Sequence, residues 1–196
     1  MKPDNAYMLE LTANMPCKQI NIDGVPYLQR YYAGTTRDNK DVWIHRFLSS
    51  DSERHLHSHP FNCVSVMLMG RYDEERINRV TKQKDVVITT PELGENTIFA
   101  IQRACGLFNH GIYAARPTGK QLLDYCPQQN TIDVFDWHRI TYAAPDTWTM
   151  LIVDPDRLPF WFFVNDSGEF ESRQSSDRDW WKEYKPRGFN IGDICT

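Results

Sequence analysis

Hydrophobic and polar residues alternate along most of the chain with the two-residue period of a β-strand. Turn residues such as Gly, Pro, Asn and Asp separate the alternating segments, which favours strands over helices. Many short strands with turns between them are typical of an antiparallel barrel or sandwich of the jelly-roll kind. The segments predicted to be strands are 25–32, 41–48, 55–69, 71–77, 85–90, 96–101, 131–143, 147–154 and 160–164.

The two ends of the chain lack this alternation. Residues 7–11 fit one turn of helix that ends before Pro16, and the aromatic-rich residues 177–184 fit a short helix packed on the barrel. A chain of 196 residues is long enough for one domain with a sizeable core. We therefore expect an all-β single domain over 1–196, with short terminal helices. Its core would span about 24–172, with an insertion at about 104–130 and a C-terminal extension at about 173–196.

Three of the six histidines stand at alternate positions, His55, His57 and His59, just before an apolar run that ends at Gly70. In a strand these side chains would share one face, because successive residues point to opposite sides. Imidazoles held that close would form half of a metal site. The alternative is an exposed polar loop that enters the strand only at Phe61.

Gly70 predicts a turn into a second alternating segment, 71–77, so that the two segments form a hairpin. Tyr72 and Glu74 would share one face of this segment, while Asp73 and Glu75 would share the other. We expect Tyr72 and Glu74 to point inward, where they could bind a substrate or orient imidazoles. The alternative is a solvated strand with charge pairs across the hairpin.

The spacing of His57, His59, position 63 and Gly70 resembles the first motif of the cupins. The resemblance implies a jelly-roll barrel, in which a later strand supplies the third histidine, here His138. Two departures stand out. Cys63 occupies the place where cupins usually have glutamate, and Asp136-Trp137 replaces the usual glycine-rich approach to the later histidine.

The residues also resemble small cupin-like proteins of bacteria and their phages. The shared features are His55-x-His57-x-His59-Pro, Gly-x-Tyr-x-Glu at 70–74, a later His138-Arg139 and an aromatic-rich tail. The likeness covers roughly residues 40–185 with a gap in the middle, and it bears on fold and metal site more than on substrate. Many cupins are dimers, so the resemblance implies a homodimer.

Two imidazoles from one strand and one from a facing strand would bind a divalent metal and leave coordination positions open. If Cys63 is a fourth ligand, the site is closed and suited to zinc. If Cys63 is a bystander, the open site of three histidines suits iron(II), which we favour. Nickel and manganese are also compatible, since imidazole binds several metals.

The leading functional hypothesis is an iron(II) dioxygenase or hydroxylase that acts on a small, polar and anionic molecule. His55, Tyr72 and an arginine, Arg46 or Arg139, would bind the substrate and pass protons. No His-x-Asp pair is present, which argues against dependence on 2-oxoglutarate. The alternatives are a metal-free epimerase or isomerase of sugar nucleotides, with a histidine base and a tyrosine acid, and a protein that only binds a small ligand.

Charge, hydropathy and cysteine usage limit the partners and the cellular compartment that we expect. The net charge of −4 is spread without long blocks, so neither nucleic acid nor a membrane surface is an expected partner. No apolar run is long enough to cross a bilayer, and the opening residues lack the apolar centre of a signal peptide, so we expect a cytoplasmic protein. The five cysteines, Cys17, Cys63, Cys105, Cys126 and Cys195, form no CxxC pair and are expected to be free thiols.

Overall fold

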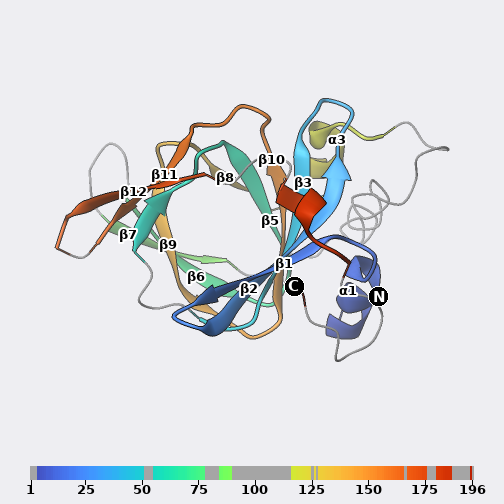
Figure 1. Ribbon diagram of the computed structural model, residues 1–196, viewed down its shortest axis with the longest axis horizontal. Coiled ribbons are helices and arrows are strands. Elements are labelled where there is room, and N and C mark those ends of the chain that lie inside the picture. The colour runs from blue at the N-terminus through green and yellow to red at the C-terminus, as the bar shows by residue number, and fades with distance from the viewer. Residues whose placement is uncertain are drawn as a thin grey trace.

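The computed structural model of the protein describes residues 4–50, 55–77, 84–89, 116–124, 126, 128–165, 167–175, 180–186 and 195. Two antiparallel sheets curve toward each other so that their strands run around a ring (Figure 1). None of the helices in this part of the chain is long and apolar enough to cross a membrane.

The first sheet has six strands. Their spatial order is β1 (Cys17–Ile22), β2 (Val25–Thr35), β3 (Asp41–Phe47), β10 (Thr147–Val153), β5 (Cys63–Met69) and β8 (Asn130–Ile132). The second sheet also has six strands. Their spatial order is β12 (Phe170–Gln174), β11 (Phe160–Val164), β4 (Leu56–Ser58), β9 (Trp137–Ala143), β6 (Tyr72–Ile77) and β7 (Lys84–Thr89).

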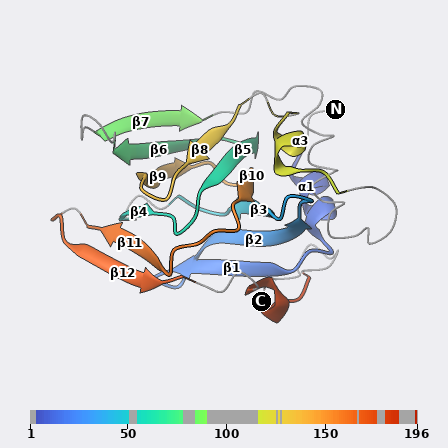
Figure 2. The same ribbon diagram turned by 90° about the horizontal axis from the view of Figure 1, so that it is seen from above.

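The eight strands from β3 to β10 follow the order of a jelly roll. The first sheet contains β3-β10-β5-β8 and the second contains β4-β9-β6-β7, so that successive strands change sheet at every step except between β6 and β7, as in two Greek keys. Strands β1 and β2 extend the first sheet, while β11 and β12 extend the second (Figure 2). The predicted all-β jelly-roll barrel is confirmed.

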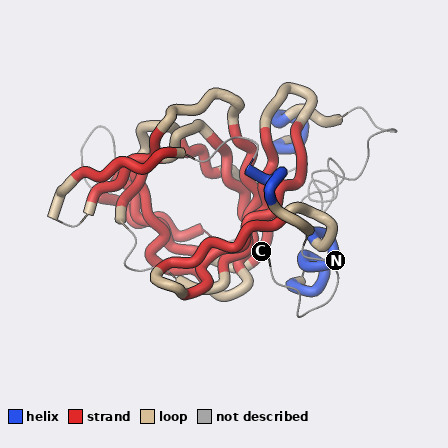
Figure 3. The backbone as a smooth tube through the Cα atoms, viewed as in Figure 1, coloured by secondary structure: helices blue, strands red, loops and turns tan. Residues whose placement is uncertain are grey.

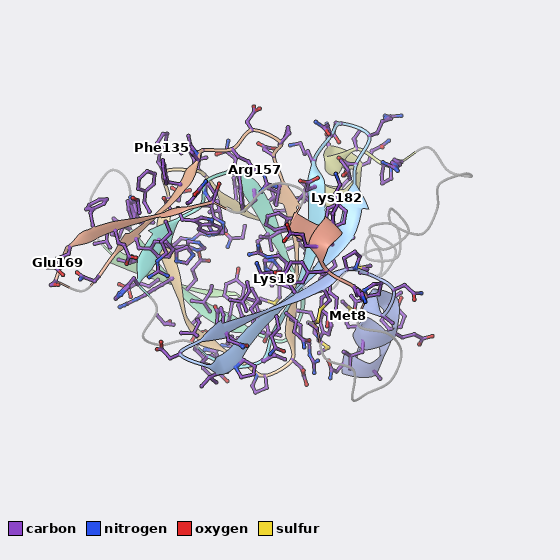
Figure 4. The ribbon with its side chains drawn as sticks, viewed as in Figure 1. Met8, Lys18, Phe135, Arg157, Glu169 and Lys182 are labelled. Atoms are coloured by element: carbon purple, nitrogen blue, oxygen red, sulfur yellow. A yellow bond between two sulfur atoms is a disulfide. The ribbon has the colours of Figure 1, made fainter. Side chains whose placement is uncertain are left out.

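Alternation along the strands separates an inner from an outer face. Outer-face residues of the first sheet, such as Ile44 and Met150, are fully buried in a cluster with Met8 of α1 (Asn5–Thr12) and Leu122 of α3 (Gly119–Leu123). Both helices lie outside the ring of strands (Figure 3), and Met8 is labelled there in Figure 4. The first sheet is therefore buried on both faces, and its inner face is available to build a site.

The short terminal helices are confirmed. Helix α1 begins after Asp4, whose carboxylate accepts a hydrogen bond from the Tyr7 backbone N–H at 2.8 Å, and it ends before Pro16. Near the other end, Trp180–Glu183 form a 3-10 turn, η1. Of the predicted insertion 104–130, residues 104–115, 125 and 127 lie outside the described residues, as does the predicted strand 96–101, and the described part contains α3 and the start of β8.

The expectation that all cysteines are free thiols is wrong for Cys17 and Cys195, which form a disulfide with a Cα–Cα distance of 5.1 Å. The chain ends meet in space, because the Cys17 backbone N–H donates to the Lys185 carbonyl at 3.2 Å. Two cysteines 178 residues apart give no local sign of such pairing. Cys63 and Cys126 are free and buried, whereas Cys105 lies outside the described residues.

Candidate metal centre

Three imidazoles converge between the two sheets: His57 on β4, His59 just after it, and His138 on β9. One ligand nitrogen from each lies within 4.8 Å of the others. The Nε2 atoms of His59 and His138 are 2.7 Å apart. The three residues are 2%, 9% and 5% exposed, respectively, so the cluster is shielded from bulk water.

Strand geometry explains this convergence. His57 and His59 are two residues apart and share a face, while His57 and His138 are direct partners across the antiparallel pair β4 and β9. Aromatic rings then hold the imidazoles in place. Phe163 of β11 stacks on His57 with ring centroids 5.8 Å apart, and Trp161 lies 4.9 Å from His59.

Glu74 on β6 orients His138. Its Oε1 atom lies 2.5 Å from Nδ1 of His138, and its side chain is fully buried. A carboxylate at this place favours the imidazole with its proton on Nδ1, which leaves the Nε2 lone pair facing the other two histidines. The Nδ1 atom of His57 lies 3.3 Å from the backbone oxygen of His55, which favours the same form there.

Further contacts hold Glu74 as a carboxylate. Burial alone would raise its pKa, but the hydrogen bonds from His138 and Arg76, together with the charge of Arg76, outweigh it, so that the pKa lies below its ordinary value. Nε of Arg76 donates to Oε1 of Glu74 at 2.8 Å. Asn130 of β8 donates to Oε2 at 3.0 Å and to the Tyr72 hydroxyl at 3.1 Å, which ties the first sheet to the second.

The cluster fits a divalent transition metal. All three candidate ligands are imidazoles, and among the described residues no Asp, Glu or Cys joins the group. Two of the rings have hydrogen-bond partners at Nδ1 that favour a free Nε2 lone pair. Such a donor set suits iron, zinc, nickel or manganese.

The cluster opens onto a cavity between the inner faces of the two sheets. Most of its wall is apolar, with Leu28, Phe47, Ile140 and Leu151 among the lining residues. Besides the three histidines, the described lining residues with polar side chains include Tyr27, Arg30, His45, Ser65, Tyr72 and Thr149. A small molecule in this cavity would contact the imidazoles directly.

Tyr72 and Glu74 lie inward, as the alternation of β6 predicts. Tyr72 is 3% exposed and lines the cavity, with its hydroxyl bonded to Asn130. His55 is exposed and does not line the cavity. Strand β4 covers only Leu56–Ser58, so His55 and His59 both lie one residue beyond its ends, and of these two only His59 turns toward His57 and His138.

The structure does not bring Arg46 or Arg139 to the cavity. Their strand neighbours His45 and His138 point inward, so both arginines point to the opposite face. There, Nη2 of Arg46 lies 2.6 Å from an oxygen of Asp146, and Nε of Arg139 lies 2.7 Å from an oxygen of Glu75.

Cys63 is not a member of the histidine group. It faces inward on β5 but packs in an apolar cluster with Trp43, Phe61 and Leu151. Burial, together with the nearby charge of Glu74, raises the pKa of the Cys63 thiol. A buried neutral thiol is a poor metal ligand, since metals bind the thiolate.

Sequence reasoning missed several residues of the site, among them Trp161, Asn130 and Arg30. Trp161 was assigned only to an apolar strand, Asn130 was assigned to an insertion, and Arg30 lies in a predicted strand with no sign of which face is inner. The alternation of Leu28, Arg30 and Tyr32 was the available signal, but it fixes a shared face and not the direction of that face.

Neither models of protein families nor the curated proteins give a match to this chain. Among solved structures, HppE in its Fe(II) form is 11% identical with a TM-score of 0.42, and the match covers 71% of this chain but only 56% of HppE. A cupin-2 domain from Rhodospirillum rubrum is 12% identical with a TM-score of 0.38, covering 84% of this chain and 78% of that domain. A structure from a study of the DMSP lyases RdDddP and RnDddQII is 9% identical with a TM-score of 0.41, covering 83% and 63%. Likenesses at this level are no guide to activity.

Proposed function

We propose that the protein is a metal-dependent enzyme, an iron(II) dioxygenase or hydroxylase, with its metal held by His57, His59 and His138. The observation that carries the proposal is the convergence of these imidazoles around one point, with Glu74 behind His138. A metal with fewer protein ligands than it can bind keeps positions for reactants, whereas a structural zinc site is closed by a fourth ligand. The bound ion would supply a redox-active Lewis acid at the cavity wall.

The chain's own residues do the remaining work. Glu74 fixes the ring plane and proton position of His138. The Tyr72 hydroxyl lines the cavity, where it can hold or donate a proton to a substrate oxygen. The apolar wall excludes water, which strengthens every polar contact inside. Substrates of this site are small molecules that fit a mostly apolar cavity.

Metal analysis of protein purified without a tag tests the proposal. We expect about one equivalent of metal per chain in the wild type and its loss in His57→Ala, His59→Ala and His138→Ala, because each removes one of three ligands. His55→Ala is the matched control, since this histidine is two residues away but exposed. Unchanged occupancy in all the variants would end the ligand assignment.

The identity of the metal decides the reaction class. Stoichiometric iron together with oxygen uptake in the presence of small carboxylic acids would support the dioxygenase or hydroxylase. Stoichiometric zinc without oxygen uptake would indicate a hydrolytic or sensory protein. The metal should be measured before any chelating purification step, because a site of three imidazoles exchanges among several divalent ions.

A second candidate is a metal-free epimerase or isomerase. The specific observation in its favour is the 2.7 Å separation of Nε2 of His59 and Nε2 of His138, which is a hydrogen-bond distance between two imidazoles. One of this pair would act as a base and Tyr72 as an acid. Full activity of chelated protein on a sugar nucleotide would favour this function over the first, and ligand binding without turnover would favour a binding protein.

A further inference from the structure

The wall opposite the histidine cluster carries a polar row. Arg30 on β2 is the direct partner of His45 on β3, and His45 is the direct partner of Thr149 on β10. All three residues line the cavity, from the first sheet, whereas His57, His59 and His138 line it from the second. A molecule in the cavity therefore has imidazoles on one side and a guanidinium on the other.

Arg30 is held in a defined orientation. Its guanidinium carbon lies 4.7 Å from the centroid of the Trp43 ring, so the cation lies over an indole that is 1% exposed. Phe61 packs edge-on against the same indole at 5.3 Å. The N–H donors of a guanidinium lie in its plane and point away from its central carbon. Contact with the indole limits where this donor fork lies, and such a fork binds a carboxylate with two parallel hydrogen bonds.

We infer that Arg30 is the substrate-binding residue of this cavity and that the substrate is a small carboxylate with an apolar body. The inference rests on the proposed function, because it names the substrate class of the same site. Among the described residues that line the cavity, Arg30 is the one arginine or lysine. It takes the role that the sequence analysis gave to Arg46 or Arg139.

The remaining residues of the cavity wall determine what the rest of the ligand can be. Leu28 and Phe47 flank the polar row, and Ile140 and Leu151 face the cavity from the central strands of the two sheets. Packed sheets lie about 10 Å apart, and the side chains of both walls take up part of that space. A carboxylate on Arg30 would thus place a chain of only a few carbon atoms against the three imidazoles.

Butanoate and butanamide are matched probes, because they have nearly the same shape and differ in charge. Binding to the full-length protein should be measured by ligand-observed NMR and calorimetry, in metal-loaded protein and again after chelation. We expect butanoate to bind about tenfold more tightly than butanamide in both forms, since charge-assisted bidentate hydrogen bonds are stronger than neutral ones. Equal binding of the two probes, or no binding of butanoate, would overturn the inference.

Variants locate the source of the preference. Arg30→Met keeps the length of the side chain and should remove the preference, whereas Arg30→Lys should keep part of it, because the charge remains without the planar fork. Arg71→Met is the control, since Arg71 is exposed and pairs with Asp73 on the surface. If Arg30→Met does not fold, as judged by circular dichroism, Arg30→Gln and the perturbation of the Trp43 indole N–H resonance by butanoate in wild-type protein give the same answer.

The outcomes separate this inference from the proposed function. A preference for butanoate that vanishes on chelation and is insensitive to Arg30→Met would show that a metal binds the carboxylate, which overturns the role of Arg30 and supports the metal centre. A preference that depends on Arg30 in protein that never contains metal would support Arg30 and overturn the metal enzyme. Arg30→Met should keep its full metal content, because Arg30 lies on the other sheet from the ligands.

Discussion

Oε1 of Glu74 lies 2.5 Å from Nδ1 of His138, although the two residues are 64 positions apart in the chain. Strands β6 and β9 are neighbours in the second sheet, and Glu74 reaches His138 diagonally across that pair. The contact gives His138 a fixed ring orientation and directs its Nε2 atom to the cluster. Carboxylates behind metal-binding histidines act in this way in general.

Glu74→Gln is therefore expected to weaken metal binding by about 10-fold to 100-fold while the barrel stays folded. The amide preserves the shape of the side chain but loses the charge that favours a proton on Nδ1 of His138. Competition with a coloured chelator of known affinity measures the loss. Circular dichroism of the variant checks that the fold is kept.

The neighbouring residue provides the control for this prediction. Glu75 points to the opposite face of β6 and pairs with Arg139 at 2.7 Å. Glu75→Gln removes the same charge from the same strand but should leave metal affinity unchanged. Equal weakening in both variants would show a general electrostatic effect and would contradict the orienting role of Glu74.

The architecture and half of the site follow from alternation. Alternation put His57 and His59 on one shared face and Tyr72 and Glu74 on another, and the expectation that these four side chains point into the barrel is correct. The expectation is wrong for His55, because His55 and His59 both lie one residue outside β4 and, of these two, only His59 lines the cavity.

The arginines show where a single sequence stops being informative. The two-residue period of a strand shows that Arg46 and His45 point to opposite faces, but it does not show which face encloses the cavity. That choice depends on which sheet packs against α1 and α3, a long-range contact with no local sign. The pairing of Cys17 with Cys195 is hidden for the same reason, since it depends on the two chain ends meeting.

The turn at Gly70 should tolerate no side chain. Its φ of +86° is left-handed, and an added Cβ would lie 2.7 Å from Cα of Thr147 and collide with the Thr147 hydroxyl. That hydroxyl is itself held, because it accepts from the Arg71 N–H at 3.1 Å and donates to the Arg71 carbonyl at 3.0 Å. We expect Gly70→Ala to lower the free energy of unfolding by about 3 kcal/mol or more, measured by urea denaturation, since strain and overpacking add.

Gly24→Ala distinguishes the cost of the left-handed backbone conformation from the cost of the steric contact with Thr147. Gly24 has a nearly equal φ of +83°, but nothing lies within 4 Å of the position of its Cβ. This variant should lose only the cost of a left-handed conformation, about 1 to 2 kcal/mol. Similar losses in the two variants would mean that the contact with Thr147 relaxes without cost.

Cys63 and Cys126 should resist alkylation in the folded protein at pH 8. Burial raises the pKa of the Cys126 thiol to about 11, and burial together with the charge of Glu74 also raises that of Cys63. Iodoacetamide reacts with the thiolate, so peptide mapping should find both residues unlabelled until urea is added. Rapid labelling of Cys63 in native protein would indicate a thiolate, and would reopen its assignment as a metal ligand.

The raised pKa of the Cys126 thiol also predicts the direction in which the stability of the fold changes with pH. A thiol whose pKa is higher in the folded state contributes stability that is fully present below its unfolded pKa, about 8.5. For Cys126 that contribution is lost as the pH rises from there through about 11. Cys126→Ser should therefore show a smaller decline in the urea midpoint over this range than the wild type.

Reduction of the Cys17–Cys195 disulfide should destabilise the protein without emptying the metal centre. The bond closes a loop of 178 residues, and a crosslink of that kind typically contributes about 2 to 5 kcal/mol by restricting the unfolded chain. Both cysteines belong to the cluster on the outer face of the first sheet, away from the cavity. Urea denaturation with and without dithiothreitol, paired with metal analysis, measures the two effects separately. The Cys17→Ser/Cys195→Ser double variant should have the stability of the reduced wild type and gain none from oxidation. Loss of metal on reduction would show that the disulfide also shapes the metal centre.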